Sequence, residues 1–217
     1  MPYRPHLATA ALTVSAALIL TACGGGSADE GGDDDRIAGA ETGGADGTDP
    51  TASPSRPAPR TGRPTVALPS SFRVEFENWT NSDLQLQAIL DDGKEELRSE
   101  YAAIIEADPR SEALAFYNTG ASLKSARKWV QGFVDDDHTL VGEGRVFAPQ
   151  VHLSNEGFGV LFYCVDESKG YTKNRKTGEK RGTPKGTDPR LQYRTRLDKS
   201  EQGVWRTTTV ETERGAC

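Results

Sequence analysis

Aromatic residues are missing from a long stretch near the start of this 217-residue chain, and this most limits what the chain can fold into. Of its 16 aromatic residues, only Tyr3 precedes Phe72, and eight of the 12 prolines fall by residue 69. A stretch rich in Gly, Pro and Asp cannot bury enough apolar surface to offset the entropy lost on ordering. We therefore expect one folded domain over 68–217, which excludes a multidomain enzyme.

The first 22 residues have the pattern of a secretory signal peptide. Arg4 supplies a positive charge, and an apolar run follows from Leu7 to Leu20. This run is shorter than the roughly 20 residues that a membrane-spanning helix needs. With no second apolar run, a polytopic membrane protein is excluded.

Residues Leu20 to Cys23, with the sequence LTAC, resemble the bacterial lipobox. The resemblance implies that Cys23 receives a diacylglycerol and becomes the new amino terminus after cleavage. Two or three acyl chains, at about 0.8 kcal/mol per buried methylene, anchor a protein stably. We therefore expect a lipid anchor in the cell membrane, facing the extracytoplasmic side. The alternative is an ordinary cleaved signal followed by an unrelated cysteine.

Residues 23–67 are expected to form a flexible, acidic, Gly/Pro-rich linker after the lipidated cysteine. Eight acidic residues and four arginines give residues 24–67 a net charge of −4. The run Asp33 to Asp35 lacks the glycine and glutamate spacing of a calcium-binding EF-hand loop. A flexible chain of this length has a root-mean-square span of roughly 35–40 Å. The composition is also typical of GC-rich organisms such as actinomycetes.

The first half of the domain is predicted to be helical. Asn81, Ser82 or Asp83 can cap a helix over 82–107, and further helices follow Asp108-Pro109 and cover 122–134. The apolar face of the long helix carries Leu86, Ile89, Leu90, Gly93, Leu97, Tyr101, Ile104 and Ile105. Its other face is predicted to be solvated: Asp91, Asp92, Glu95, Glu96, Arg98 and Glu100.

The second half of the domain has the two-residue period of strands. Residues 151–153, 190–198 and 204–212 alternate, while 158–165 is apolar on both faces, as in a central strand. Residues 72–76 fit a strand, but Phe72, Phe76 and Trp79 also fit a helix. Helices followed by antiparallel strands predict an α+β fold, with the helices on one face of a curved sheet.

Several short motifs carry a family resemblance: Trp79, then Leu90 to Gly93, Tyr163 to Glu167, Gly203 to Trp205, and Gly215 to Cys217. In this order they resemble small secreted actinomycete lipoproteins with a nuclear transport factor two-like (cystatin-like) domain. The resemblance implies a cone-like fold. That superfamily includes polyketide cyclases, ketosteroid isomerases and non-catalytic binding modules, so the fold does not decide the function.

The cysteines predict a disulfide rather than a catalytic or metal site. With Cys23 lipidated, Cys164 and Cys217 remain in an oxidising compartment. The alternative is a free Cys164, for which His152 is the nearest candidate partner in a dyad. His138 and His152 do not have zinc-ligand spacing. We expect no metal and no cofactor, and no known nucleophile motif is present.

Two groups of side chains are candidates for a site. Asp166 and Glu167 end the predicted central strand, where they either form the rim of an acid/base pocket or cap a turn. Five aromatic residues either line a pocket in the cone or belong to the core: Trp79, Tyr101, Tyr117, Trp129 and Tyr163.

Residues 169–199 form a strongly basic segment, with 11 Lys and Arg against three acids, a net charge of +8. Its candidate contacts with an anionic partner are Lys173, Arg175, Lys176, Lys180 and Arg181. That partner would be an anionic cell-wall polymer, lipid headgroups or an acidic face of an envelope protein. Nucleic acid is not expected outside the cell. The alternative is a soluble β-hairpin with its turn at 173–178.

The absence of a catalytic motif favours a lipid-anchored binding or scaffolding module of the cell envelope. An isomerase- or cyclase-type enzyme with a pocket in the cone is the alternative, and a buried carboxylate would favour it. A structural partner in an envelope complex is the third possibility, and a large exposed apolar patch would favour that.

Overall fold

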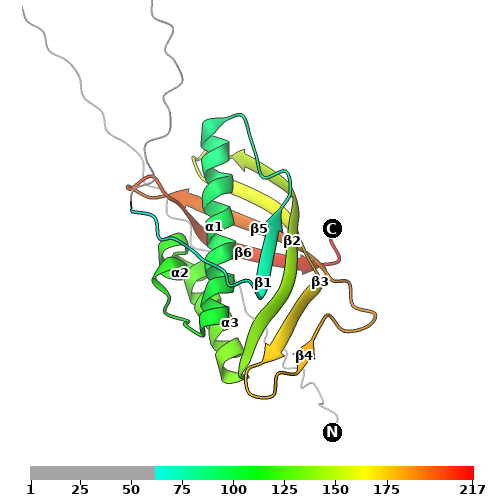
Figure 1. Ribbon diagram of the computed structural model, residues 1–217. Helices are drawn as coiled ribbons and strands as arrows, with labels where there is room; N and C mark the ends of the chain where they lie inside the picture. Colours follow the sequence, from blue (N-terminus) through cyan, green and yellow to red (C-terminus); the bar gives the residue numbers. More distant parts are fainter. Residues whose placement is uncertain (1–61) are drawn as a thin grey trace, which may run out of the picture. The chain divides into compact units, whose positions relative to one another are not determined.

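The computed structural model describes residues 62–217 (Figure 1). The predicted signal peptide, the predicted lipidation site Cys23 and most of the predicted linker therefore lie outside the described residues. The elements, in chain order, are β1 (Phe72–Phe76), α1 (Leu84–Glu106), α2 (Glu112–Tyr117), α3 (Gly120–Asp135), β2 (His138–Leu153), β3 (Gly159–Asn174), β4 (Lys180–Arg181), β5 (Arg190–Lys199) and β6 (Trp205–Arg214). The predicted α+β class is confirmed, with the helices packed on one face of the sheet (Figure 1).

One sheet contains all the strands. Its order is β1-β2-β3-β5-β6, and β4 pairs with the far end of β3. β3 is the central strand, as the apolar run 158–165 predicted, and all pairs except β1–β2 are antiparallel. The ambiguous segment 72–76 is a strand because it pairs in parallel with Gly142 to Val146 of β2.

The sheet is curved, and two irregularities in β2 help to bend it. The pairing of β2 with β3 shifts between Glu143 and Arg145 and again between Phe147 and Gln150. Such bulges bend a strand and increase its twist. Gly142 precedes the first shift at φ 98°, and a Cβ atom there would collide with the carbonyl oxygen of Lys169. The position therefore requires glycine.

Helix α1 packs closely on the sheet through its predicted apolar face. Asp83 caps its first turn by accepting backbone N–H bonds, and Ile89 and Leu97 are buried. At Gly93 a Cβ atom would lie 2.6 Å from a methyl carbon of Leu161 in β3. Glycine at this position therefore lets the helix approach the central strand, where a larger side chain would hold it away.

The prediction that the other face of α1 is solvated is wrong at three carboxylates. Asp92, Glu96 and Glu100 are 1%, 2% and 9% exposed. They are four residues apart and so lie along one stripe of the helix. Helices α2 and α3 and strand β6 also pack against α1 and cover this stripe. The charge pattern of a helix does not report what later segments of the chain place against it.

The buried carboxylate of Asp92 holds the segment before β1 against the domain. Arg63 donates to its two oxygens at 2.9 and 2.8 Å, and the backbone N–H of Trp205 donates at 2.9 Å. Val66 is buried, and its carbonyl oxygen accepts a bond from Arg98 at 2.7 Å. Residues 62–67, which the composition assigned to the linker, therefore pack on the folded domain.

Cys164 and Cys217 form a disulfide-capable pair. Their Cα atoms are 6.1 Å apart, within the roughly 7 Å that a bridge can span. Cys164 lies on the central strand, whereas Cys217 follows the edge strand β6. A bond here would tie the segment after β6 to the centre of the sheet.

Candidate ligand-binding groove

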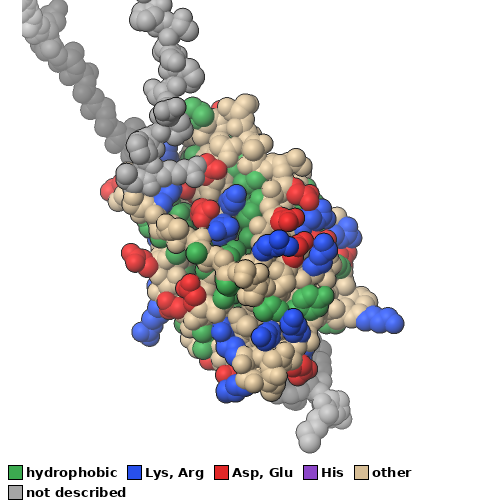
Figure 2. Space-filling view, in the orientation of Figure 1, with side chains coloured by type: hydrophobic (Ala, Val, Ile, Leu, Met, Phe, Trp, Pro, Cys, Tyr) green, Lys and Arg blue, Asp and Glu red, His purple; other side chains and the backbone are tan. Residues whose placement is uncertain are grey.

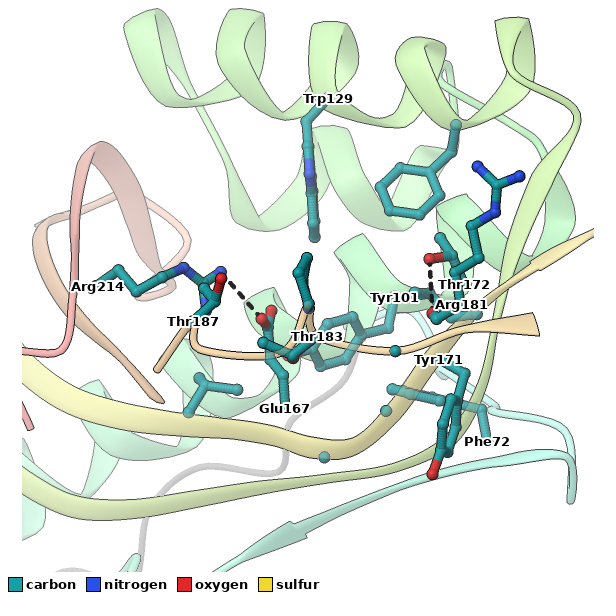
Figure 3. A pocket seen from close by; sticks show the side chains of 17 residues that line it. Phe72, Tyr101, Trp129, Glu167, Tyr171, Thr172, Arg181, Thr183, Thr187 and Arg214 are labelled. Atoms are coloured by element: carbon teal, nitrogen blue, oxygen red, sulfur yellow. Dashed lines mark hydrogen bonds and ion pairs between the residues drawn. The ribbon is translucent and has the colours of Figure 1, made fainter. Parts of the chain in front are cut away.

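Two adjoining pockets lie between helix α3 and the sheet. The first, the hairpin pocket, has a volume of about 410 Å³ and is lined on one side by the segment after β4 (Figure 3). The second, the helix pocket, has a volume of about 350 Å³ and is lined by α3, β5 and β6. Trp129, Glu167 and Arg214 line both pockets. We call the two pockets together the groove. The sheet is thus hollowed beside α3, whereas α1 packs closely on it.

The five aromatic residues proposed from the sequence divide between the groove and the core. Tyr101 and Trp129 line the hairpin pocket, and Trp129, 38% exposed, points from α3 into it (Figure 3). Trp79, Tyr117 and Tyr163 are buried core residues and do not line either pocket. Trp79 donates from its indole N–H to the carbonyl oxygen of Leu90 at 2.6 Å, which fixes it beneath α1.

Asp166 and Glu167 have different roles because successive residues of a strand face opposite ways. Glu167 lines the groove and pairs with Arg214 at 3.2 Å (Figure 3). Asp166 instead accepts the backbone N–H of Ser168 at 2.9 Å. Its carboxylate also lies 3.5 Å from Arg145. Contrary to the prediction from the sequence, neither residue ends the strand or caps a turn, because β3 continues to Asn174.

The sequence did not predict the two acids that lie deepest beside the groove. Glu100 lines the helix pocket, and Glu96 lies one helical turn before it. Burial raises the pKa of Glu96 to about 7. Burial, together with the neighbouring Glu96, raises the pKa of Glu100 well above its usual value. The two carboxyl groups interact with each other, and burial favours the protonated form of both.

The surroundings of this carboxyl pair are polar but uncharged on most sides. Asn118, at the corner between α2 and α3, lies beside Glu96, and its side-chain oxygen accepts the hydroxyl of Ser122. Burial also raises the pKa of Tyr163 and of Tyr193, so both phenols stay neutral. The spacing of the two glutamates was the signal that could have found the pair. A ligand in the helix pocket would therefore meet a protonated carboxyl group at its wall.

The basic segment does form a hairpin, in which Lys173 of β3 lies opposite Lys180 of β4. Arg175 is exposed but is bonded to the domain. Its guanidinium donates to the carbonyl oxygens of Ile104 and Ile105 at the end of α1, at 2.6 and 3.1 Å. Arg175 therefore binds the exposed carbonyls of a helix terminus, a structural role in place of the partner contact expected from its charge.

The remaining basic candidates differ in their surroundings. Lys176 pairs with Asp137 at 2.6 Å and remains largely exposed. Arg181 lines the hairpin pocket, where its side chain extends along the pocket wall (Figure 3). The basic segment and the aromatic residues, which the sequence presented as separate features, thus contribute to one site.

The remaining candidates give no catalytic or metal site. His152 is exposed on β2 and stacks on Phe162, with ring centroids 6.2 Å apart, while Cys164 lies beside Cys217. Between residues 62 and 217, no three His, Cys, Asp or Glu side chains are grouped closely enough to hold a metal ion. In the same part of the chain, every helix is too short or too polar to cross a bilayer.

No protein-family model matches the sequence, and no curated protein matches it. Solved structures with a similar fold include the intermembrane space region of the chloroplast protein ARC6 (12% identity, TM-score 0.45, covering 63% of this chain and 100% of that one). Another is Aln2 from a Streptomyces species (11% identity, TM-score 0.41, covering 57% of this chain and 88% of that one). A third is a protein from Catenulispora acidiphila (10% identity, TM-score 0.43, covering 58% of this chain and 91% of that one). With TM-scores below 0.5, these likenesses carry no inference about function.

Proposed function

We propose that this protein is a lipid-anchored binding module of the bacterial cell envelope that holds a small, mainly apolar molecule in the groove. The observation that carries the proposal is the groove itself, open between α3 and the sheet with the half-exposed Trp129 in its wall. The hairpin pocket, at about 410 Å³, falls within the usual range for ligand sites, roughly 300–1,000 Å³.

The lining supports binding of an apolar molecule in preference to a purely structural role. Phe72, Tyr101 and Phe133 line the hairpin pocket around Trp129, and threonine, arginine and glutamate side chains complete the lining. Ligand sites have this composition, because apolar walls provide affinity and a few polar groups provide orientation. A scaffolding surface would need no such hollow.

Binding of N-phenyl-1-naphthylamine, an uncharged aromatic probe, tests the proposal. We expect its fluorescence to rise on addition of the protein and Trp129→Ala to weaken binding about tenfold. An aromatic contact contributes about 0.5–1.5 kcal/mol beyond the buried area, and 1.4 kcal/mol corresponds to a factor of ten. Leu84→Ala, which removes an exposed apolar side chain at the start of α1, is the control. Equal binding by both variants would place the probe outside the groove.

The carboxyl pair favours a second candidate, an enzyme of the isomerase or cyclase type. Glu100 lines the helix pocket, and burial raises its pKa, as the general acids of enzymes require. Exchange of the α-protons of 2-tetralone with D2O, followed by NMR, tests this candidate. Faster exchange with the wild type, lost in Glu100→Gln, would support an enzyme. Equal rates with both proteins would support the binding module in preference to the enzyme.

The anchor is part of the proposal and rests on the lipobox-like sequence that ends at Cys23. We expect Cys23→Ala to prevent acylation. The protein should lose the mass of the lipid and should no longer partition with lipid-anchored proteins. Intact-mass analysis and detergent phase partitioning measure the two effects, and Ser27→Ala should change neither. If both variants and globomycin-treated cells yield protein of the same mass and partitioning, Cys23 is not lipidated.

A further inference from the structure

The groove has unlike ends. Glu167 and Arg214 line both pockets, but Arg181 lines only the hairpin pocket, whereas Glu100, with Glu96 behind it, lines only the helix pocket. We infer that the ligand is an amphipathic anion, with its apolar body along Trp129 and its single anionic head at Arg181. The inference rests on the proposed function and adds the chemical class and orientation of the ligand.

Arg181 is held where it can receive such a head group. Its carbonyl oxygen accepts the hydroxyl of Thr172 at 3.1 Å, and β4 pairs with β3 at these two residues. Its side chain is 68% exposed, and its Nε donates to Glu179 at 3.0 Å. The guanidinium has further N–H donors, and their planar arrangement suits a carboxylate, sulfonate or phosphate.

The charges near Arg181 reinforce this preference. Lys173 and Lys180 lie on the two strands of the hairpin, and Lys185 follows in the segment that borders the pocket. The acids nearby are already paired, Glu179 with Arg181 itself and Asp188 with Arg190. Lys and Arg side chains are visible over the hairpin beside exposed hydrophobic atoms (Figure 2). The positive electrostatic potential of these side chains raises the local concentration of anions at the mouth of the pocket.

The same pocket supplies the surface for an apolar body. Phe133, Leu140 and Tyr171 line it together with Trp129, so one molecule can contact Arg181 and the aromatic walls at once. Thr183 borders the space between Trp129 and Arg181, and Thr187 lies on the side of Glu167 and Arg214 (Figure 3). The site therefore combines a basic, polar rim with an apolar interior.

The carboxyl pair sets the direction in which the molecule enters. Glu96 and Glu100 are among the most buried charged residues of the chain, and no Lys or Arg pairs with either in the described region. In the helix pocket an anionic head would find one basic side chain, Arg214, which is already paired with Glu167, beside carboxyl groups that become negative when they ionise. The head group is therefore directed to the hairpin end.

Two probes with the same aromatic body test the inference. 8-Anilinonaphthalene-1-sulfonate carries one anionic group, and N-phenyl-1-naphthylamine is the same molecule without it. We expect the full chain to bind the sulfonate more tightly, and added salt to weaken only the sulfonate. Arg181→Gln should weaken the sulfonate about threefold to fivefold and leave the uncharged probe unchanged. Arg181→Glu should have a larger effect in the same direction.

Arg194→Gln is the matched control, because it removes the same charge from the opposite face of the sheet, outside the groove. Equal affinity for the two probes, or equal effects of the two substitutions, would overturn the inference while leaving groove binding intact. Failure of both probes to bind would instead overturn the proposed function.

The anion could be a free amphiphile or a membrane lipid, and competition separates these sources. Dodecyl phosphate, used below its critical micelle concentration, and phosphatidylglycerol vesicles are each added to the protein with the sulfonate bound. Displacement by dodecyl phosphate alone indicates a free molecule, and displacement by the vesicles indicates a lipid headgroup. Displacement by neither, with bound sulfonate confirmed in the groove by Trp129→Ala, would overturn an amphipathic anion as the ligand.

Discussion

Replacing Cys164 and Cys217 with alanine is expected to lower the free energy of unfolding by about 4 kcal/mol. The two residues are 53 positions apart, and a bridge between them restricts the unfolded chain over that whole length. The loss is comparable to much of the net stability of a small domain, roughly 5–15 kcal/mol. Because Cys164 lies on the central strand, the bridge also holds the segment after β6 against the sheet.

Urea denaturation of the oxidised and reduced protein measures this effect. Reductant should shift the wild-type midpoint to that of the double variant and should leave the double variant unchanged. Single replacement of Cys217 should reproduce most of the loss, since either substitution prevents the bond. Alkylation of two free thiols in the exported, non-reduced protein would contradict the pairing.

The stability of the domain is expected to fall as the pH rises through the neutral range, because of Glu96 and Glu100. Burial raises the pKa of Glu96 from 4.5 to about 7, and the pKa of Glu100 is raised further. Below about pH 4.5 the folded and unfolded chains both hold these protons. Between that pH and about 7 the unfolded chain releases protons that the folded chain retains, so the free energy of unfolding decreases.

Glu96→Gln is expected to remove much of this decrease. At 1.36 kcal/mol per pKa unit, the shift of Glu96 alone corresponds to about 3 kcal/mol. The variant should therefore be more stable than the wild type at pH 8 and similar to it near pH 4. The titratable and charged groups that face the pair are Tyr101, Tyr163, Glu167, Tyr193 and Arg214.

Urea midpoints measured from pH 4 to pH 8.5 provide the measurement. Glu106→Gln, in the exposed last turn of the same helix, is the control and should leave the profile unchanged. A wild-type profile that rises or stays flat between pH 5 and 8 would show that the pair is not buried as described. Glu100→Gln should flatten the profile as well, since it removes the second buried carboxyl group whose pKa is raised on folding.

The sequence predicted most of the fold because local patterns specified it. The helices lie close to their expected positions, since apolar periodicity and capping residues act over a few neighbouring positions. Strand β3 begins as expected but continues to Asn174, past the predicted end at Val165. The segment 72–76 was another exception among these elements. Its residues fit two structures, and the parallel pairing with β2, more than 60 residues later, decided between them.

The residues of the candidate site were likewise predicted only where residue type or composition indicated them. Composition separated the aromatic-poor start of the chain from the domain, and residue type alone singled out Cys164 with Cys217, Trp129 and the basic segment. Only the tertiary structure buried Glu96 and Glu100, since α2, α3 and β6 come from later parts of the chain. It also directed Arg175 to the end of α1 and Arg181 to the hairpin pocket. Net charge and hydrophobic periodicity are set by residues that are close in sequence. Burial and hydrogen-bond partners depend on which distant segments the fold brings together.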